Sequence, residues 1–455
     1  MNKYDILVIG GGPAAITIAK TIQGKLSVGI IRPEDHSMIY CAMPYAIEGL
    51  LPFEKTLKKD AIVTEAKASL IRDKVTKVNF HAKTVETEKS GEIAYGKLVI
   101  ATGATPVLPP IPGRDLNGVM TFKTANDLQR IMEQVDNGLK KAVVVGAGAI
   151  GIELAQALNE RNVETHLVDM GDYILPNMVD YGIVERTQES LIKSGVKLHL
   201  KSKVTALQGE TVVEEVLLEN MQIIHFDQMD HCSEAGTAIL PGLVVFAVGM
   251  KPNIELFADT DLKTERDGIV VDNKLATNID SVYAAGDCCQ FTSGITGEVI
   301  SGKLATNAVP MARVLANNFL GKDRTYPGFF NGTATRIGDF YIGGTGFSET
   351  TARKHFDVEV GYAEFTTAFP IMPDTTKIRL KLIADKNTHK IVGGQFVSGK
   401  PVTDKVDKIT MAIQYGITLE QLVNFSYSAQ PYQSFYPAHN LIVKAAESIL
   451  RKISS

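Results

Sequence analysis

The sequence is poor in several features, and each shortage excludes a class of protein. No stretch approaches about eighteen consecutive apolar residues, so we expect no membrane-spanning helix. Cysteine occurs 4 times in 455 residues, which is too few for a disulfide scaffold and leaves only local cysteine chemistry. The 47 basic and 51 acidic residues leave a formal charge of −4, which gives no broad positive field for nucleic acid or an anionic membrane. Tryptophan is absent, which by itself excludes nothing.

The composition is that of an ordinary globular protein, with 45% hydrophobic and 22% charged residues. The length predicts two or three separate cores. The chain runs from Met1 into the apolar residues 6–9 without the long apolar region and cleavage site of a signal peptide, which predicts a cytoplasmic protein. Apolar positions at helical spacing in residues 441–450 favour packing or subunit contact over membrane binding.

One internal repeat organises the chain. Residues 4–20 and 141–157 each read as a polar lead, a run of apolar β-formers, a glycine cluster and small residues at helical spacing. From about Pro327 the composition changes, and alternation in residues 377–383 indicates antiparallel strands, followed by helices. We therefore expect two nucleotide-binding domains in series and a third domain of α+β type.

The glycine clusters of the repeat are dinucleotide-binding fingerprints. Residues 10–15 (GGGPAA) satisfy GxGxxA and residues 146–151 (GAGAIG) satisfy GxGxxG, each after a strand and at the start of a helix. The first glycine permits the tight turn, the second lets the backbone approach a pyrophosphate, and the small third residue lets helix pack on strand. The helix N-terminus then faces the phosphate charge. Two matches in this context make purely structural turns the less favoured interpretation.

The residues that end the next strands differ between the two loops. Asp169 ends the strand after the second loop, where an acid accepts a hydrogen bond from a ribose 2′-hydroxyl. No Arg or Lys follows until Arg186, so a 2′-phosphate would meet uncompensated negative charge and NADH is favoured over NADPH. The strand after the first loop ends in Arg32, with Glu34 and Asp35 just beyond, so the ribose contact there must be arranged differently.

The order of further motifs resembles the FAD-dependent pyridine nucleotide-disulfide oxidoreductases across essentially the whole chain. Residues 101–113 and 249–253 look like the two segments that connect the FAD and NAD domains. Residues 283–287 (YAAGD) are similar to the second FAD fingerprint, whose aspartate, here Asp287, hydrogen-bonds the ribityl chain. The resemblance implies an α/β fold with two Rossmann-like dinucleotide-binding domains, for FAD and NAD, and a C-terminal α+β dimerisation domain.

The resemblance also implies boundaries and contacts. An FAD-binding domain would span residues 1–113 and 245–326, an NAD-binding domain residues 114–244, and a dimerisation domain residues 327–455. The FAD contacts would be Gly10, Gly12, Pro13, Ala14, Ala15, Arg32, Ala101, Thr102, Gly103, Gly286, Asp287, Leu304 and Ala305. The NAD contacts would be Gly146, Gly148, Ile150, Gly151, Glu153, Asp169 and Gly249.

Residues 37–45 (SMIYCAMPY) resemble the single-cysteine branch of the family, which holds coenzyme A-disulfide, persulfide and polysulfide reductases, NADH oxidases and NADH peroxidases. The second position of a CxxxxC pair falls on Ala46, so an internal redox disulfide of that type is excluded. Cys41 would cycle through a mixed disulfide, a persulfide or a sulfenic acid beside the flavin. A buried, inert cysteine is the alternative. The candidate catalytic residues are Cys41, Tyr40, Ser37 and Tyr427.

Departures from the branch's pattern bear on the substrate. Residues 4–20 lack the histidine with which peroxidases and many oxidases handle peroxide, and Pro13 stands in that region. Tyr40 replaces the asparagine common in coenzyme A-disulfide reductases, and it either hydrogen-bonds a sulfur intermediate or packs on the flavin. Ala149 replaces an aromatic residue that covers the nicotinamide pocket in many relatives, so NADH should reduce the flavin fast.

The resemblance implies a homodimer in which the C-terminal domain completes the partner's active site. Tyrosines of that domain act as proton donors in relatives, and Tyr427 matches one such position. Phe369 replaces the other and cannot protonate a leaving thiolate. Tyr432 and Tyr436 stay open as substitutes, although packing tyrosines are commoner. His439 lacks the His-Pro context of the acid/base histidine in two-cysteine enzymes.

The remaining cysteines have weaker chemical contexts. Cys288 and Cys289 directly follow the second FAD fingerprint, and packing is favoured over redox chemistry for both. Cys232 lies near His225 and His231 but lacks the regular spacing of a metal site, so no metal is expected.

The leading hypothesis is an NADH-dependent FAD enzyme that reduces a small sulfur substrate, a persulfide, polysulfide or coenzyme A disulfide, through Cys41. An NADH oxidase or peroxidase acting through a Cys41 sulfenic acid is the first alternative. An electron-transfer reductase of the rubredoxin type, with Cys41 inert, is the second.

Overall fold

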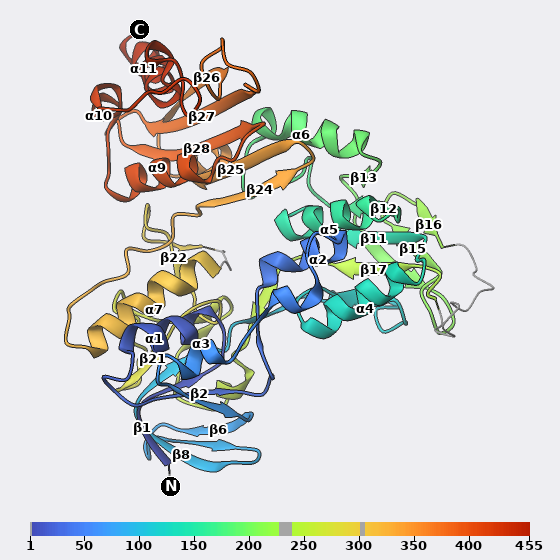
Figure 1. The fold of residues 1–455 in the computed structure, drawn as a ribbon, viewed down its shortest axis with the longest axis vertical. Helices are drawn as coiled ribbons and strands as arrows, with labels where there is room; N and C mark the ends of the chain where they lie inside the picture. Colours follow the sequence, from blue (N-terminus) through green and yellow to red (C-terminus); the bar gives the residue numbers. More distant parts are fainter. Residues whose placement is uncertain (1, 227–238, 301–304) are drawn as a thin grey trace.

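The computed structural model describes residues 2–226, 239–300 and 305–455. Three large sheets follow one another through the described ranges, and we number them in chain order (Figure 1). The first sheet has the strand order β5 (Ser69–Arg72), β2 (Val28–Arg32), β1 (Asn2–Ile9), β8 (Gly91–Ile100), β7 (Thr84–Thr87) and β6 (Val75–Asn79), with β21 (Val282–Ala284) against β8.

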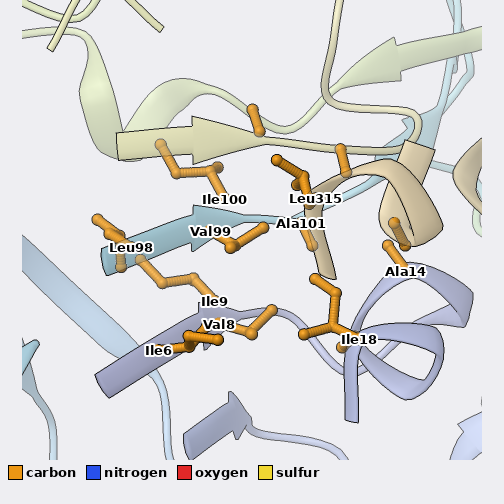
Figure 2. Close-up of a cluster of buried hydrophobic side chains, with 14 of the residues drawn as sticks. Ile6, Val8, Ile9, Ala14, Ile18, Leu98, Val99, Ile100, Ala101 and Leu315 are labelled. Carbon is orange, nitrogen blue, oxygen red and sulfur yellow. The ribbon is translucent and has the colours of Figure 1, made fainter. Parts of the chain in front are cut away.

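The first sheet is parallel at its centre and covered by helices. β1 pairs with β2 and β8 in parallel, and its apolar run, Ile6 to Ile9, is buried as a strand covered on both faces requires. α1 (Pro13–Ile22) and α7 (Ala305–Phe319) pack together, and Figure 2 shows Ile18 and Leu315 meeting the side chains of β1 and β8. This packing holds α1 rigidly behind the first glycine loop.

The second sheet repeats this plan. Its strands are all parallel, and α5 (Ala149–Glu160) follows its glycine loop, as α1 follows the first. The strand order is β10 (Val119–Thr121), β17 (Leu243–Phe246), β11 (Lys141–Val145), β12 (Glu164–Val168) and β13 (Lys197–His199), with α4 (Ala125–Asp136) and α6 (Tyr181–Lys193) also in this part of the chain. β17 crosses the expected boundary at residue 244/245, so this sheet extends two residues beyond it.

The two connections between these sheets are joined side by side. β9 (Ala104–Pro106) runs out of the first sheet unit and pairs antiparallel with the returning β18 (Met250–Pro252). Asn253 and Thr102 form two hydrogen bonds with each other. Thr102 Oγ1 donates to the Asn253 carbonyl at 2.7 Å, and Asn253 Nδ2 donates to the Thr102 carbonyl at 3.0 Å. The first and second sheets are therefore linked by two connections that are hydrogen-bonded to each other.

The third sheet is antiparallel, as the alternation in residues 377–383 predicts. Its order is β24 (Thr333–Ile337), β25 (Phe340–Gly346), β28 (Ile391–Ser398), β27 (Lys377–Asp385) and β26 (Val358–Thr366). α9 (Thr403–Gln414) and α11 (Leu441–Ser454) pack against it, and the apolar face predicted for residues 441–450 is buried there. The predicted α/β fold with a C-terminal α+β unit is confirmed.

A buried ion cluster joins the third sheet to the second. Lys381 on β27 is 4% exposed, and its Nζ lies 2.8 Å from Asp180 Oδ2, at the start of α6, and 2.7 Å from Glu349 Oε2. Gln395 on β28 donates to the same Asp180 oxygen at 2.7 Å. Burial alone would lower the pKa of Lys381, but the hydrogen bonds to both carboxylates outweigh burial and raise it.

Replacing Lys381 with methionine should lower the free energy of unfolding by ~3 kcal/mol, because it leaves two carboxylates without their cation. Because the pKa of Lys381 is raised, its charge stabilises the fold up to strongly alkaline pH. The loss of unfolding free energy in Lys381→Met should therefore be constant from about pH 6 to 9. Urea unfolding followed by circular dichroism measures it. Lys386→Met is the matched control, since the exposed Lys386–Asp357 pair, 3.1 Å apart, should matter little. Equal effects of the two variants would contradict the prediction.

Candidate active site

A cavity of about 510 Å³ opens at the carboxyl ends of the first sheet's central strands, the edge at which open α/β sheets bind ligands. Ile9, at the end of β1, and Arg32, at the end of β2, mark this edge. Most predicted FAD and catalytic residues line the cavity: Gly10, Gly12, Pro13, Ala14, Arg32, Ser37, Tyr40, Ala101, Thr102, Gly103, Gly286 and Asp287. Residues from four separated stretches of sequence are thus brought together as predicted.

Of the predicted FAD residues whose surroundings are described, Ala15 does not line this cavity. It is fully buried in α1, where a small side chain lets the helix pack on the sheet. Leu304 lies outside the described residues. Ala305 begins α7, and the surroundings of its side chain are not described.

The first glycine loop has the geometry that its sequence predicts. Gly10 has φ +114°, and a Cβ there would lie 2.1 Å from the Ala101 carbonyl oxygen, so no other residue fits without distortion. Gly12 has ordinary backbone angles, and a Cβ there would meet nothing within 4 Å. Gly12 therefore faces open space at the cavity wall.

This space fits a dinucleotide phosphate. Gly12 is the N-cap of α1, no side chain caps the helix, and its first turn holds no acidic residue. The backbone N–H groups of that turn, at Ala14 and Ala15, have no intrahelical acceptor, and the helix dipole favours an anion there. The first loop is thus a phosphate cradle of the kind FAD requires.

Arg32 packs against Gly11 of the first glycine loop. Its side chain is 2% exposed, its guanidinium pairs with Asp60, and its Cδ lies 2.2 Å from where a Cβ on Gly11 would be. Glu34 lines the cavity, whereas Asp35 is paired with Arg72 at 2.6 Å. Of these two carboxylates, Glu34 is therefore the one that faces the cavity, two residues after Arg32.

The second glycine loop has the same geometry. Gly146 has φ +110°, and a Cβ on Gly151 would lie 1.8 Å from the Gly146 carbonyl oxygen. Gly148 is the N-cap of α5, which also has no side-chain cap and no acidic first turn. Ile150, in that turn, is 49% exposed, and Gly249, with φ +117°, follows β17. The loop is a second phosphate cradle.

Asp169 is held at the tip of the second loop. Its two carboxylate oxygens accept from the backbone N–H groups of Ala147 and Gly171, each at 2.6 Å. Lys201 also reaches this loop, because its N–H donates to the Gly171 carbonyl at 3.0 Å and its Nζ lies 3.1 Å from Asp172. The cation that approaches this loop is therefore paired with Asp172, and NADH stays the nucleotide that the sequence favours.

Cys41 is an exposed free thiol at the edge of the flavin cavity. It lies in a short 3-10 turn, Tyr40–Ala42, between β3 (Ser37–Met38) and α2 (Met43–Glu48). Ser37, Met38 and Tyr40 line the cavity, and Ser37 is buried. The thiol is therefore reachable from solvent while its neighbours face the flavin site, and the interpretation of Cys41 as a buried residue is wrong.

Lys123 is a site residue that sequence reasoning missed. It lines the cavity, its Nζ donates to the Ala104 carbonyl, and it lies 5.1 Å from the centre of the Tyr40 ring, a cation–π contact. Burial lowers the pKa of Lys123, and the charge of Asp287 opposes this. Burial, with the charges of Glu34 and Asp287, raises the pKa of Tyr40, so its hydroxyl stays protonated. No motif marks Lys123, because only folding brings it to the cavity.

Glu153 lies where three elements meet. It is on α5, which packs against α2 and β24, and Thr335 Oγ1 of β24 donates to its Oε1 at 2.6 Å. Burial raises the pKa of Glu153, and the Thr335 hydrogen bond opposes this. Tyr45 lies on α2. Burial raises its pKa most, and the charges of Glu153, Glu48 and Cys41 raise it further. Tyr45 and Thr335 carry no fingerprint in the sequence.

The predicted C-terminal residues gather on the third sheet unit, apart from Cys41 of the same chain. Tyr427 donates its hydroxyl to the Pro437 carbonyl at 2.7 Å. Tyr436 packs edge-to-face on Phe369, with ring centres 5.3 Å apart, and His439 stacks on Phe365. Tyr432 is 65% exposed. In the described residues no hydrogen bond or ring contact links this cluster to Cys41 of the same chain.

The other cysteines differ from Cys41. Cys288 and Cys289 are both 0% exposed in the core of the first sheet, and the Cys288 thiol donates to the Ile100 carbonyl at 3.4 Å. This burial supports packing for both. Cys232 and His231 lie outside the described residues.

Gly12→Ala should leave folding unchanged but weaken FAD binding by about tenfold or more, because the methyl group occupies the phosphate space. FAD retention and the Kd for FAD after deflavination measure this. Gly182→Ala, where an added Cβ also meets nothing, is the matched control and should bind FAD normally. A Gly12→Ala protein with unchanged FAD affinity would place the pyrophosphate elsewhere.

Comparison with known proteins agrees with this geometry. The family described as "Pyridine nucleotide-disulphide oxidoreductase" matches residues 4–312, and its dimerisation domain matches residues 334–437. An NADH oxidase of Methanocaldococcus jannaschii is 32% identical over 467 residues, covering 99% of both chains. A CoA-dependent NAD(P)H sulfur oxidoreductase of Pyrococcus abyssi is 30% identical over 433 residues, covering 91% of this chain and 92% of the relative.

Solved structures extend this likeness. A NAD-dependent persulfide reductase from A. fulgidus superposes with a TM-score of 0.90 at 29% identity, covering 100% of this chain and 84% of that one. Across the described ranges, no helix has the length and apolar character that crossing a membrane demands. Since the family matches residues 4–312 and relatives match nearly end to end, this chain belongs to the pyridine nucleotide-disulphide oxidoreductases and is an NAD(P)H-dependent flavin oxidoreductase.

Proposed function

We propose that the enzyme uses NADH to reduce a small sulfur substrate, a persulfide, polysulfide or coenzyme A disulfide, through Cys41. The observation that carries this proposal is an exposed thiol at the flavin cavity, while Cys288 and Cys289 are buried. Ala46 stands where a resolving cysteine would be, so Cys41 must take its sulfur partner from the substrate. The names of the P. abyssi and A. fulgidus relatives support this substrate class.

The residues of the chain divide the work between two nucleotides. When bound, FAD supplies the two-electron exchange between NADH and the sulfur centre. The first glycine loop, Lys123 and Asp287 would hold this group, and the second loop with Asp169 would hold NADH. Asp169 meets the ribose 2′-hydroxyl, which favours NADH over NADPH.

The sulfur chemistry at Cys41 balances as NADH + H⁺ + RSSH → NAD⁺ + RSH + H₂S. The Cys41 thiolate attacks the outer sulfur of RSSH, the substrate S–S bond breaks, and the RS⁻ leaving group takes a proton. Two electrons that originate in NADH then cleave the Cys41 persulfide into thiolate and hydrosulfide. Tyr40, next to Cys41 and kept protonated by burial, is placed to donate a hydrogen bond to these sulfur anions.

The site is completed by a second copy of the chain in this proposal. The matched dimerisation domain carries Tyr427, Tyr436 and Phe369, which lie apart from their own Cys41. A homodimer would present this cluster to the partner's thiol. With Phe369 in place of a tyrosine, the cluster has one hydroxyl fewer with which to protonate a leaving thiolate, which counts against reduction of a bulky coenzyme A disulfide.

The test is a turnover panel with NADH under anaerobic conditions, using coenzyme A persulfide, inorganic polysulfide and coenzyme A disulfide. Oxygen and peroxide are assayed separately. We expect kcat/KM for at least one sulfur substrate to exceed the values for oxygen and peroxide by about a hundredfold. Faster turnover with oxygen or peroxide would overturn the proposal.

An NADH oxidase is the second candidate, because the M. jannaschii relative carries that name. Oxygen would then oxidise the site, and Cys41 would pass through a sulfenic acid. The first loop, however, offers no histidine for peroxide chemistry, and the residues near Cys41 that could donate a proton are Tyr40 and Tyr45. We therefore place this activity second.

A further inference from the structure

The third sheet reaches the nucleotide-binding side of its own chain. α5 carries Glu153 one turn beyond the second glycine loop, and it packs between α2, which continues from Cys41, and β24 (Figure 1). The carboxyl of Glu153 thus lies between the nucleotide loop and the helix that follows the thiol. Half-buried in this position, it has few ways to be solvated.

The one hydrogen bond described for the Glu153 side chain comes from Thr335. Thr335 is 7% exposed, and its Oγ1 donates to Glu153 Oε1 at 2.6 Å. One carboxyl oxygen, Oε1, is therefore fixed by the third sheet, and Oε2 is the oxygen left to bind a ligand. A hydrogen bond to an ionised acceptor is short and strong, and this one favours the ionised form of Glu153.

We propose that Thr335 is a positioning residue for NADH: through its hydrogen bond it orients the Glu153 carboxyl toward the nicotinamide carboxamide. This rests on the proposed function, in which the second loop binds NADH. An ionised Oε2 accepts the carboxamide N–H and attracts the positive ring of NAD⁺. The third sheet then serves the nucleotide site of its own chain, in addition to any role at a subunit interface.

The titratable and charged groups that face Glu153 lie on the elements packed against α5. Tyr45 of α2 feels the charges of Glu153, Glu48, Cys41 and Arg336, of which Arg336 lies on β24. Burial raises the pKa of Glu153 and the Thr335 hydroxyl opposes this, so loss of that hydroxyl moves the ionisation to higher pH.

A loss of the Thr335 hydroxyl should not detach the third sheet. Gln156 also joins α5 to β24, because its Nε2 donates to the Arg336 carbonyl at 3.0 Å and its Oε1 accepts from the Gly338 N–H at 2.6 Å. Valine matches threonine in shape and suits a strand. Thr335→Val therefore removes one hydrogen bond and little else.

The test is the Kd of NAD⁺ for the FAD-loaded enzyme, measured by isothermal titration calorimetry across pH. Binding should tighten as pH rises through the titration of Glu153. In Thr335→Val the midpoint of this change should move upward by roughly one pH unit, since a hydrogen bond to a charged group is worth about one such unit. Thr335→Ser, which keeps the hydroxyl, should restore the wild-type midpoint, and Glu153→Gln should abolish the pH step.

Thr333→Val is the matched control, because Thr333 lies on the same face of β24, two residues away, and should leave the midpoint unchanged. Thr335→Ala gives the same test if the valine variant does not fold. An unchanged midpoint in Thr335→Val, or a pH step that persists in Glu153→Gln, would overturn the inference. Failure of the proposed function looks different: the wild-type enzyme would then not turn over any sulfur substrate, whereas the pH step in NAD⁺ binding and its shift in Thr335→Val would remain.

Discussion

Cys41→Ser should lower turnover with sulfur substrates by about a thousandfold or more, while NADH still reduces the flavin at close to the wild-type rate. Serine has nearly the same size, but its hydroxyl does not ionise near neutral pH and cannot attack sulfane sulfur. The nucleotide loops lie on other elements, so binding of both nucleotides should persist. Steady-state turnover and anaerobic stopped-flow flavin reduction measure the two parts separately.

A spectrum gives an independent check of the same variant. A thiolate beside an oxidised flavin produces a long-wavelength absorbance band, which should appear during titration of the wild-type enzyme with NADH and be absent from Cys41→Ser. Cys289→Ala is the control, since that side chain is 0% exposed and should affect stability rather than turnover. If Cys41→Ser keeps both the spectrum and the turnover, Cys41 is inert and electrons leave to another acceptor.

The phosphate-binding parts of the site could be predicted from the sequence because they are local. Positions 10 and 146 require glycine because φ is positive and because an added Cβ would lie 2.1 or 2.5 Å from a backbone carbonyl oxygen. These requirements fix the spacing of the glycines in the sequence. The same holds for Gly12, which must leave room for a phosphate. Local backbone geometry of this kind constrains which residues can stand at neighbouring positions, so a sequence motif reveals it.

The side chains that tune the site could not be predicted, because they arrive from distant segments. Lys123 reaches the flavin cavity from the end of β10, and Thr335 reaches Glu153 from a different sheet. Lys201 approaches the second loop through β13, although it lies far from Asp169 in sequence. None of these contacts requires a particular spacing of residues along the chain, so no sequence motif indicates them.

The proton donors are still harder to predict from the sequence, because the family resemblance places them on the partner subunit. Phe369 and Tyr436 share an edge-to-face contact, so the hydroxyl lost at position 369 has a neighbour that carries one. The pattern alone left Tyr432 and Tyr436 open. The contact with Phe369 favours Tyr436 as the substitute.

Asp169→Ala combined with Met170→Arg should raise the ratio of kcat/KM for NADPH to that for NADH by about a hundredfold. Asp169 presents a negative charge where a 2′-phosphate would lie, and like charges at such a distance cost several kcal/mol. Its removal also frees the N–H groups of Ala147 and Gly171, which now donate to the Asp169 carboxylate, to donate to a phosphate instead. Met170 is 70% exposed, so an arginine there reaches the phosphate without disturbing the core.

The control for this specificity change is Asp172→Ala, which releases Lys201 from its ion pair but leaves Asp169 in place. If Asp169 decides the preference, this single variant should change the ratio by less than about threefold, because the freed cation does not remove the repulsion. A large gain for NADPH from Asp172→Ala alone would instead show that Lys201 controls the choice. The two carboxylates lie three residues apart on one loop, so initial rates with each nucleotide separate their roles directly.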